Sequence, residues 1–331
     1  MSVRFRNSDI VSLLQEKGSL SADEEVEETG LAVPAPLPGQ SCDVVFALFM
    51  EPLERPDPRW GWPEYLIDVA IRKFQPSPTM VHCELLIPPL PSDEGNRTQF
   101  ATYYGHHSAW QSDHLDGFGY YLVEHAAHWR AVPIFAHDAA HRLRTEANGE
   151  LGVDYSLSRY CTSAFPLRAF SSFVPVGRRK PAHCATLLSR VLKNGVPENS
   201  PQHSAAWYGP STLYSELCDR AADYGMALAG GEPSPLMLPK HTEESIDALL
   251  RKPMTHDTVH NVGDEGCMDA VRALTLRVTD ALGAGDLAAQ RITQKQLATA
   301  LLRWVILRQP LPGIPATERP KVGEHQNYFR A

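Results

Sequence analysis

The sequence predicts an α+β fold in which an antiparallel sheet packs against a helix that begins at a cysteine. Apolar and β-branched residues surround His82 in residues 80–87, and this pattern favours a strand. Leucines and valines after Cys184 recur at helical spacing up to Leu192. Short alternating segments between residues 99 and 135 predict further strands, and the last third of the chain has helical periodicity.

Residues 1–39 are predicted to be an N-terminal arm and linker outside the core. Residues 8–16 have helical spacing and lead into an acidic stretch at residues 22–28. Three prolines and a glycine at residues 34–39 then form a stiff extended linker. Such a segment lacks the apolar periodicity to build its own core.

The predicted sheet begins at Cys42, with a strand over residues 42–49. The strand that carries His82 ends at Pro88-Pro89, because proline cannot donate to a ladder. Three further strands are predicted after His82, at residues 99–104, 119–123 and 129–135. Two helices are predicted, one before His82 at residues 65–74 and one after the strands at residues 138–147.

The helix that follows Cys184 places this thiol in a chemically useful position. Leu187, Leu188 and Val191 fall on one helix face, so Cys184 lies in or just before the first turn. The free N–H groups and the positive dipole end of a helix stabilise a thiolate and lower its pKa. The same groups can stabilise the oxyanion that forms when a carbonyl is attacked.

His82 is the candidate base for Cys184, and Glu84 shares its strand face. Glu84 either orients the imidazole or lines the cleft, and Gln99 on the next strand is a further candidate for the orienting role. Cys83 points to the opposite face and is expected to be a buried apolar residue. His183 is not expected to serve as the base, because neighbouring residues on a turn diverge.

Other residues offer rival chemistry. Cys161 is the strongest competing thiol, although its helical context favours a core position. Histidines recur at helix-compatible spacing in the pairs His125/His128 and His137/His141. Neither pair has the acid of a His-Glu-x-x-His motif, so no metal site and no cofactor is expected.

Four segments in this order resemble the circularly permuted NlpC/P60 group of papain-like proteins, which includes YiiX-like proteins, lecithin:retinol acyltransferase relatives and some poxvirus proteins. They are the strand at residues 42–49, His82 with its strand, residues 152–157 and the Cys184 helix. The resemblance spans roughly residues 40 to 195. It implies a permuted papain-like core over residues 40–229, with Cys184 and His82 as the catalytic pair. It also places Tyr155 before the nucleophile, as an oxyanion donor or a packing residue.

The resemblance implies two functions from different classes. One is a cysteine hydrolase or acyltransferase that acts on a peptide, isopeptide or lipid acyl substrate. The other is a non-catalytic structural or docking protein on the same fold, such as a minor capsid or virion-associated component. Cys42, Ser156 and Ala185-Thr186 replace residues of the family pattern. The changed residues after Cys184 and the long arms favour the docking protein, whereas the retained His82 and Cys184 favour the enzyme.

The end of the chain is predicted to be helical and then extended. Ser211 is expected to cap a helix that ends near Tyr224, and residues 230–235 form a linker. A helical extension over residues 230–309 contains helices at residues 243–250, 267–284 and 294–309. The tail, residues 310–331, contains four prolines and is expected to dock on a protein partner.

Composition and charge argue against several classes of protein. A net charge of −8 and a pI near 6.0 argue against a nucleic-acid binder. No apolar run approaches the ~18 residues that a membrane span needs. The six cysteines lack the paired spacing of a disulfide framework, and the N-terminus lacks the apolar core of a signal peptide. We therefore expect an intracellular protein, in the cytoplasm or in a virion.

Overall fold

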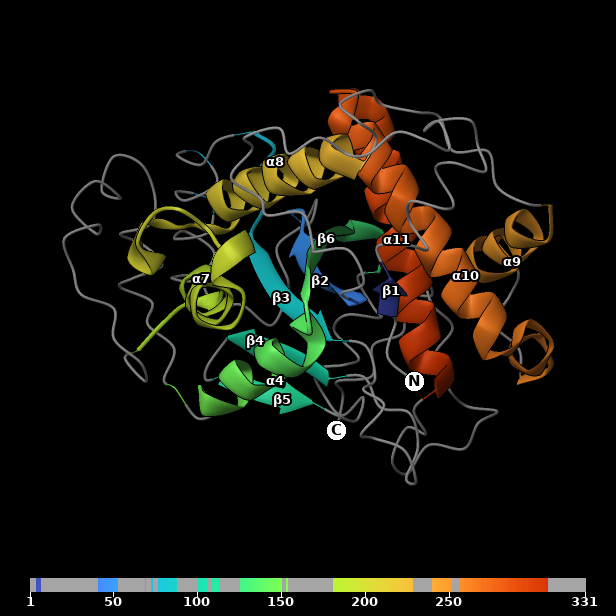
Figure 1. Ribbon diagram of the computed structural model, residues 1–331, viewed down its shortest axis with the longest axis horizontal. Coiled ribbons are helices and arrows are strands. Elements are labelled where there is room, and N and C mark those ends of the chain that lie inside the picture. The colour runs from blue at the N-terminus through green and yellow to red at the C-terminus, as the bar shows by residue number, and fades with distance from the viewer. Residues whose placement is uncertain are drawn as a thin grey trace.

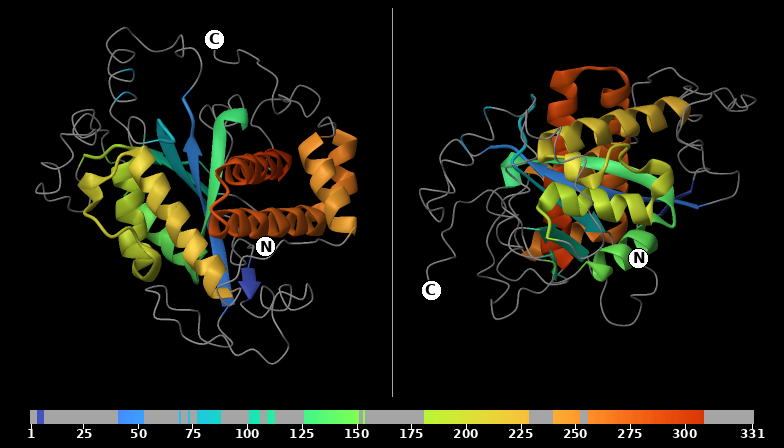
Figure 2. Two further views of the ribbon diagram at one scale, coloured as in Figure 1. Left: turned by 90° about the horizontal axis from the view of Figure 1, so that it is seen from above. Right: turned by 90° about the vertical axis from the view of Figure 1, so that its left-hand side faces the viewer.

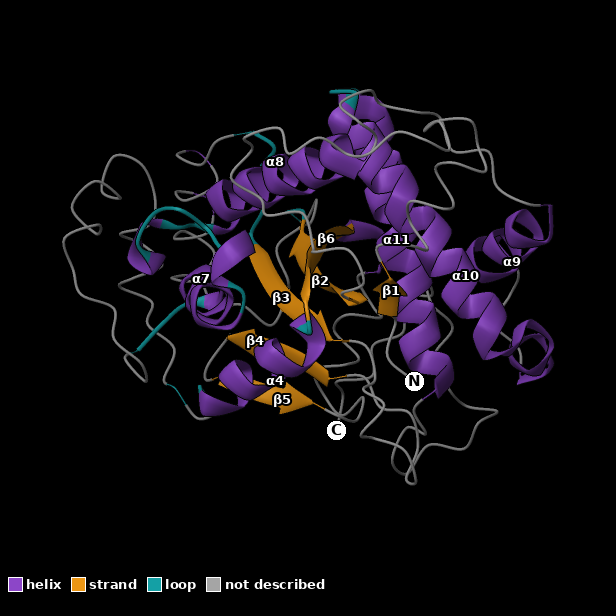
Figure 3. Cartoon of the chain, in the orientation of Figure 1, coloured by secondary structure: helices purple, strands orange, loops and turns teal. Residues whose placement is uncertain are grey.

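A computed structural model describes the fold for residues 4–6, 41–52, 69, 73, 77–87, 101–105, 109–112, 126–150, 153, 181–228, 240–251 and 256–308. Within these ranges the protein has an antiparallel sheet and surrounding helices, as Figures 1 and 3 show. The expected α+β class is confirmed.

The sheet contains six described strands, all paired antiparallel. They are β1 (Arg4–Arg6), β2 (Ser41–Met50), β3 (His82–Ile87), β4 (Ala101–Gly105), β5 (Ala109–Ser112) and β6 (Trp129–His137). One edge of β2 pairs with β6 from Cys42 to Met50. The other edge pairs first with β1 and then with β3, and β4 and β5 follow β3. The strand β2 is therefore at the centre of the sheet.

Most of these strands were predicted, at nearly the observed bounds. The strand predictions at residues 42–49, 80–87, 99–104 and 129–135 correspond to β2, β3, β4 and β6. Neither β1 nor β5 was predicted, and β1 lies within the segment that the sequence assigned to the N-terminal arm. The predicted strand at residues 119–123 and the helix at residues 8–16 lie outside the described residues, as does nearly all of residues 65–74.

The strand β2 is buried on both faces. Every side chain from Val44 to Met50 has an exposure of 1 % or less. Figure 2 shows why, because helices cover the sheet from both sides: α4, α7 and α8 on one side, α9, α10 and α11 on the other. A strand covered on both faces reads as a continuous apolar run, which matches Val44-Val45-Phe46-Ala47-Leu48-Phe49.

The covering helices have well-defined bounds. They are α4 (Ala139–Gly149), α7 (Cys184–Gly195), α8 (Pro210–Leu228), α9 (Lys240–Arg251), α10 (His256–Gly283) and α11 (Leu287–Arg308). Short 3-10 turns lie at Ala126–His128, Pro197–Asn199 and Ala205–Trp207. Each of these α-helices overlaps a predicted helix, although α10 and α11 begin well before the predicted starts at residues 267 and 294. Among the helices of the described residues, none combines the length and the apolar content needed to cross a membrane.

Ser211 does not cap α8 as the sequence predicted. The helix begins one residue earlier, at Pro210, where proline's missing N–H costs nothing. Thr212 Oγ1 instead accepts a hydrogen bond of 2.9 Å from the N–H of Gly209. Ser211 Oγ accepts a 2.8 Å hydrogen bond from the N–H of Met80, so this hydroxyl links α8 to the residues that precede β3.

The C-terminal helices share one hydrophobic core with the sheet. A single cluster of buried apolar residues extends from Val44 in β2 to Trp304 in α11. In Figure 1, α10 and α11 lie side by side, α11 packs on β6, and α10 packs on α8 and α9. The described part of the predicted helical extension therefore completes the core around β6.

Candidate active site

Cys184 is the first residue of α7. His183 before it has an extended backbone, and its side chain makes no capping hydrogen bond to the helix. The first intrahelical bond runs from the N–H of Leu187 to the carbonyl of His183, at 2.9 Å. The N–H groups of residues 184–186 precede this bond and have no acceptor within the helix. They lie beside the thiol, where a helix favours negative charge.

The helix α7 is fixed rigidly in the core. Residues 184–192 are all buried, which is unusual for a helix with polar members such as Thr186 and Ser189. Arg190 Nη2 donates a 2.6 Å hydrogen bond to Glu150 Oε2 at the end of α4, and both side chains are almost inaccessible. The buried ion pair joins α7 to α4 and sets the position of Cys184.

His82 begins β3 and lies in one row with two residues of neighbouring strands. Met50 of β2 pairs with His82 on one side and with Trp129 of β6 on the other. The Trp129 ring approaches the imidazole edge-on, with centroids 6.0 Å apart. Glu84 lies two residues further along β3, and its Oε1 is 3.2 Å from Nε2 of His82. The expected contact between Glu84 and the imidazole is therefore present.

The electrostatics couple Cys184 to His82. Burial disfavours the imidazolium, but the negative charge and hydrogen bonding of Cys184, together with Glu84, raise the pKa of His82 to about 10. Burial likewise disfavours the thiolate. Hydrogen bonding with Cys83 and the positive charge of His82 outweigh burial and hold the pKa of Cys184 well below its ordinary value. This combination favours a thiolate–imidazolium ion pair.

Two neighbours of the pair influence it in ways that the sequence did not predict. Cys83 was expected to be a buried apolar residue on the strand face opposite His82; it is buried, and hydrogen bonding with it also lowers the pKa of Cys184. Burial and the nearby Cys184 charge raise the pKa of Cys83 well above its ordinary value, so Cys83 stays protonated and donates. β4 pairs with β3 only from Glu84 onward, so this pairing ends short of His82 and Cys83.

His183 also interacts with the thiol, although the sequence argument set it aside. Its fully buried side chain contributes to the lowered pKa of Cys184. The reason is the backbone at the helix start. The extended conformation of His183 lets its side chain leave the helix axis, whereas the argument from divergence assumed regular helical geometry.

Glu84 is a buried carboxyl with an incomplete set of partners. Its exposure is 1 %, and burial raises its pKa in spite of the opposing effect of His82. Its second oxygen, Oε2, makes no hydrogen bond with the described residues. A carboxylate stabilises an imidazolium that it contacts. Glu84 is therefore placed to orient the His82 ring and to favour the protonated form of that ring.

Several predicted residues cannot be placed. Tyr155, Cys161, Gln99 and His125 lie outside the described residues. His137 and His141 are exposed at the end of β6 and in α4. Within the described ranges, no group of three histidine, cysteine or acidic side chains is arranged to hold a metal ion.

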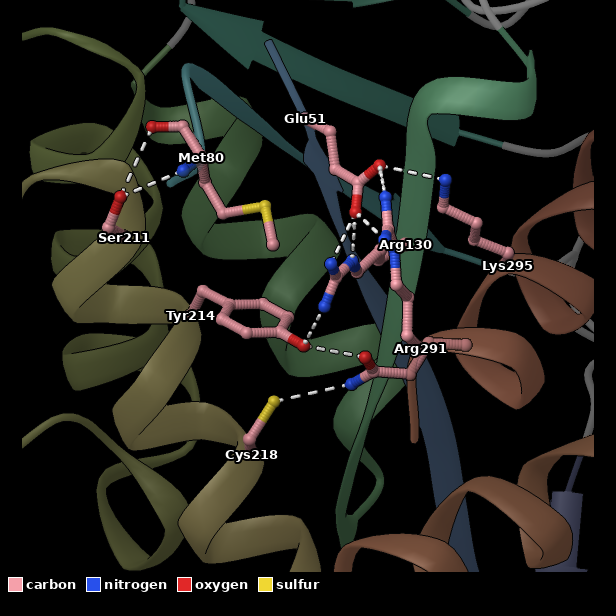
Figure 4. Close-up of polar contacts among 9 residues, drawn as sticks. Glu51, Met80, Arg130, Ser211, Tyr214, Cys218, Arg291 and Lys295 are labelled. Carbon is pink, nitrogen blue, oxygen red and sulfur yellow. Dashed lines mark hydrogen bonds and ion pairs between the residues drawn. The ribbon is translucent and has the colours of Figure 1, made fainter. Parts of the chain in front are cut away.

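A cluster of charged residues behind the site was not recognised in the sequence. Glu51 follows β2 and accepts hydrogen bonds from three cationic side chains on two elements (Figure 4). Arg130 Nε of β6 lies at 2.7 Å, Arg291 Nε of α11 at 3.2 Å and Lys295 Nζ of α11 at 2.8 Å. Burial alone would raise the pKa of Glu51, but these partners lower it to about 2. No short motif marks such a cluster, because 240 residues separate Glu51 from Arg291.

Arg130 extends the cluster to α8. Its Nη1 donates a 3.0 Å hydrogen bond to the hydroxyl of Tyr214. That hydroxyl donates at 2.6 Å to Gln294 Oε1 of α11, and Gln294 Nε2 donates to Cys218 Sγ at 3.3 Å (Figure 4). The network therefore joins α8, α11 and the start of β6.

Comparisons of the chain with protein-family models, with curated protein sequences and with solved structures found no match.

Proposed function

We propose that this protein is a papain-like cysteine hydrolase or acyltransferase that acts on an amide or ester through Cys184 and His82. The observation that carries the proposal is the electrostatic pairing of a helix-opening thiol with a strand-borne imidazole. The pKa of the thiol is lowered and that of the imidazole is raised, and both shifts favour the reactive thiolate. The permuted papain-like fold is part of the same proposal.

Other thiols in the described core lack this activation. Burial raises the pKa of Cys218 to about 12 and that of Cys267 to about 11. The four cysteines whose side chains are described are all buried free thiols, so burial does not distinguish Cys184 from the rest. Its position at a helix start beside His82 does.

The proposed reaction has two steps. The Cys184 thiolate attacks the carbonyl carbon, a C–S bond forms, and the N–H groups of the first turn of α7 stabilise the oxyanion. The His82 imidazolium then donates its proton to the leaving amine or alcohol as the C–N or C–O bond breaks. In the second step His82 takes a proton from water or an acceptor amine, which attacks the thioester and releases the acyl group.

Glu84 has a positioning role in this proposal. A carboxylate 3.2 Å from Nε2 orients the ring and stabilises the imidazolium before acylation. A glutamate two residues after the histidine on one strand keeps this contact local, so loop movements elsewhere do not disturb it.

One observation favours the alternative of a non-catalytic structural protein. The exposure of Cys184 is 3 % and that of His82 is 9 %, so neither group is open to a large substrate in this conformation. A structural protein, such as a minor component of a virion, would keep these residues as core packing. Acylation of Cys184 by an activated ester separates the two functions.

The experiment is acylation of the full chain by p-nitrophenyl acetate, followed by peptide mapping. The proposal expects an acetyl group on Cys184 in the wild type and in the control variant Cys218→Ala, and none at this position in Cys184→Ala. His82→Asn should slow acylation by about a hundredfold or more, the usual contribution of a general acid–base. Equal acetylation of several residues, or a rate that Cys184→Ala leaves unchanged, would support the structural alternative. A panel of peptide, isopeptide and lipid esters then identifies the acyl class.

A further inference from the structure

We infer that Glu51 is a positioning residue for His82, through which the C-terminal helices hold the active-site end of the sheet. The inference rests on the proposed function, because it concerns the geometry of the same Cys184–His82 pair. It goes further than the proposed function because it assigns the predicted helical extension, through α11, a role in holding His82 in position. The contacts that carry it are those drawn in Figure 4.

Three strand ends meet at His82. The row His82–Met50–Trp129 crosses β3, β2 and β6 at the end of each strand that lies nearest the site. Backbone bonds close this end: the N–H of Val81 donates to the carbonyl of Met50 at 2.9 Å, and the N–H of Glu51 donates to the carbonyl of His128 at 2.8 Å. Movement of any one strand end therefore moves the imidazole or its Trp129 neighbour.

Side chains of α8 and α11 bind residues at or next to the ends of β2, β3 and β6. Glu51, the residue after Met50, binds Lys295 at 2.8 Å and Arg291 at 3.2 Å, both on α11. Arg130, the residue after Trp129, binds the same carboxylate and Tyr214 of α8. Met80, two residues before His82, is bound through its backbone by Ser211 of α8. The two helices thus fix β2, β6 and β3 at once.

Charge explains why Glu51 is the central member. Arg130, Arg291 and Lys295 carry three positive charges around one carboxylate, and Glu51 has an exposure of only 8 %. Without this carboxylate the three cations repel one another, and a buried arginine loses its ionic partner. We expect α11 to move away from β6, and Trp129 to move with the strand start.

A buried ion-pair cluster ordinarily stabilises the fold. A test must therefore separate this stabilising role of Glu51 from its proposed role in positioning His82. Removing Glu51 alone changes the local charge, which by itself shifts a thiol pKa. The double variant Glu51→Gln/Lys295→Gln removes one charge of each sign and leaves the net charge unchanged. The charged or titratable groups that face the thiol itself, His82, Cys83, Glu84 and His183, are all kept.

The matched control is the double variant Glu243→Gln/Arg277→Gln. It removes an ion pair between α9 and α10, again without a change in net charge. This pair joins two C-terminal helices that pack on α11, and neither of its side chains bonds to β2, β3 or β6 in the described contacts. Any general effect of loosening these helices appears in both variants.

The measurement is the rate of Cys184 alkylation by iodoacetamide from pH 5 to 9, read by peptide mapping of the full chain. We expect the Glu51/Lys295 variant to raise the apparent pKa of Cys184 by about half a unit or more, so that the alkylation rate at pH values below the wild-type midpoint falls about threefold relative to the rate at pH 9. The control variant should keep the wild-type profile. Folding of each variant is checked by its denaturation midpoint.

If the Glu51/Lys295 variant does not fold, Ser211→Ala gives the test, because it removes the bonds between this hydroxyl and the Met80 backbone without a change in charge and should move the profile in the same direction. A folded variant with the wild-type pH profile would overturn the positioning role. An ordinary thiol pKa for Cys184 in the wild type is a different outcome, since it would remove the proposed function itself.

Discussion

Nε2 of His82 lies 3.2 Å from Oε1 of Glu84, and the two residues share one face of β3. The contact is local in sequence, yet it becomes chemically meaningful only because α7 places Cys184 against the same strand. The carboxylate favours the imidazolium, and the imidazolium favours the thiolate.

Glu84→Gln is therefore expected to weaken the ion pair without changing side-chain shape. Loss of the negative partner lowers the pKa of His82, and a less charged imidazole raises the pKa of Cys184. If the shift is about one pKa unit, the midpoint of the Cys184 alkylation profile rises by about one pH unit, and the rate at each pH below the wild-type midpoint falls about tenfold. The pH dependence of alkylation measures the shift, and Glu146→Gln, at a partly exposed position on α4, is the control. An unchanged profile would mean that Glu84 only fills space.

The thiols should differ in reactivity by position. At pH 6, limiting iodoacetamide should label Cys184 ahead of Cys218 and Cys267, whose pKa values burial raises. Peptide mapping by mass spectrometry gives the order of labelling, and labelling in denaturant gives the reference in which the thiols become equivalent. Preferential labelling of Cys218, or of Cys161, would contradict the assignment of the nucleophile.

Cys83 should influence Cys184 as a hydrogen-bond donor. Cys83→Ala removes the donor and is expected to raise the pKa of Cys184, whereas Cys83→Ser keeps a donor of similar size and should largely restore it. The measurement is the alkylation profile of Cys184 in both variants. Equal profiles for alanine and serine would show that the contact acts through packing alone.

The ion pair should also appear in the pH dependence of stability. The pKa of His82 rises from 6.5 to about 10 on folding, so its contribution is complete below pH 6.5 and is lost as pH rises through 10. The pKa of Cys184 falls from 9.0, so its contribution is complete above pH 9 and is lost as pH falls through the lowered pKa. Between pH 6.5 and 9 the two slopes oppose each other.

The difference in unfolding free energy between the wild type and Cys184→Ala should accordingly be flat from about pH 6.5 to 9 and smaller on either side. Urea denaturation from pH 5 to 10.5 measures it. A difference that rises steadily across the flat interval would mean that only the thiol, and not the imidazole, is ionised in the folded protein.

Packing between α7 and α4 gives a prediction that is independent of the chemistry. A Cβ on Gly195 would lie 2.7 Å from Cδ2 of Leu143 and 3.4 Å from its Cα. Gly195→Ala should therefore destabilise the fold by about 1–3 kcal/mol through overpacking. Gly149→Ala is the control, because nothing lies within 4 Å of its Cβ position. Thermal denaturation compares the two, and equal midpoints would contradict the close contact.

The sequence by itself determined most of the strands and helices, and the contact between two site residues of one strand. An uninterrupted apolar run defined β2, and apolar and β-branched residues around His82 defined β3. Helical spacing defined α7 and the C-terminal helices, and strand alternation placed Glu84 on the same face as His82. These features depend on backbone periods of two and 3.6 residues, so they can be read within one segment.

Tertiary structure alone decided the remaining contacts. Cys83 and His183 lie close to Cys184, where the pairing of β4 with β3 has ended at Glu84 and the residue before α7 is extended. Glu51 gathers Arg130, Arg291 and Lys295 from segments up to 240 residues away. Ser211 bonds to Met80 across 131 residues. No local period encodes such contacts, since each depends on how separate elements pack, and packing sets the burial and charge that shift the pKa values of the site.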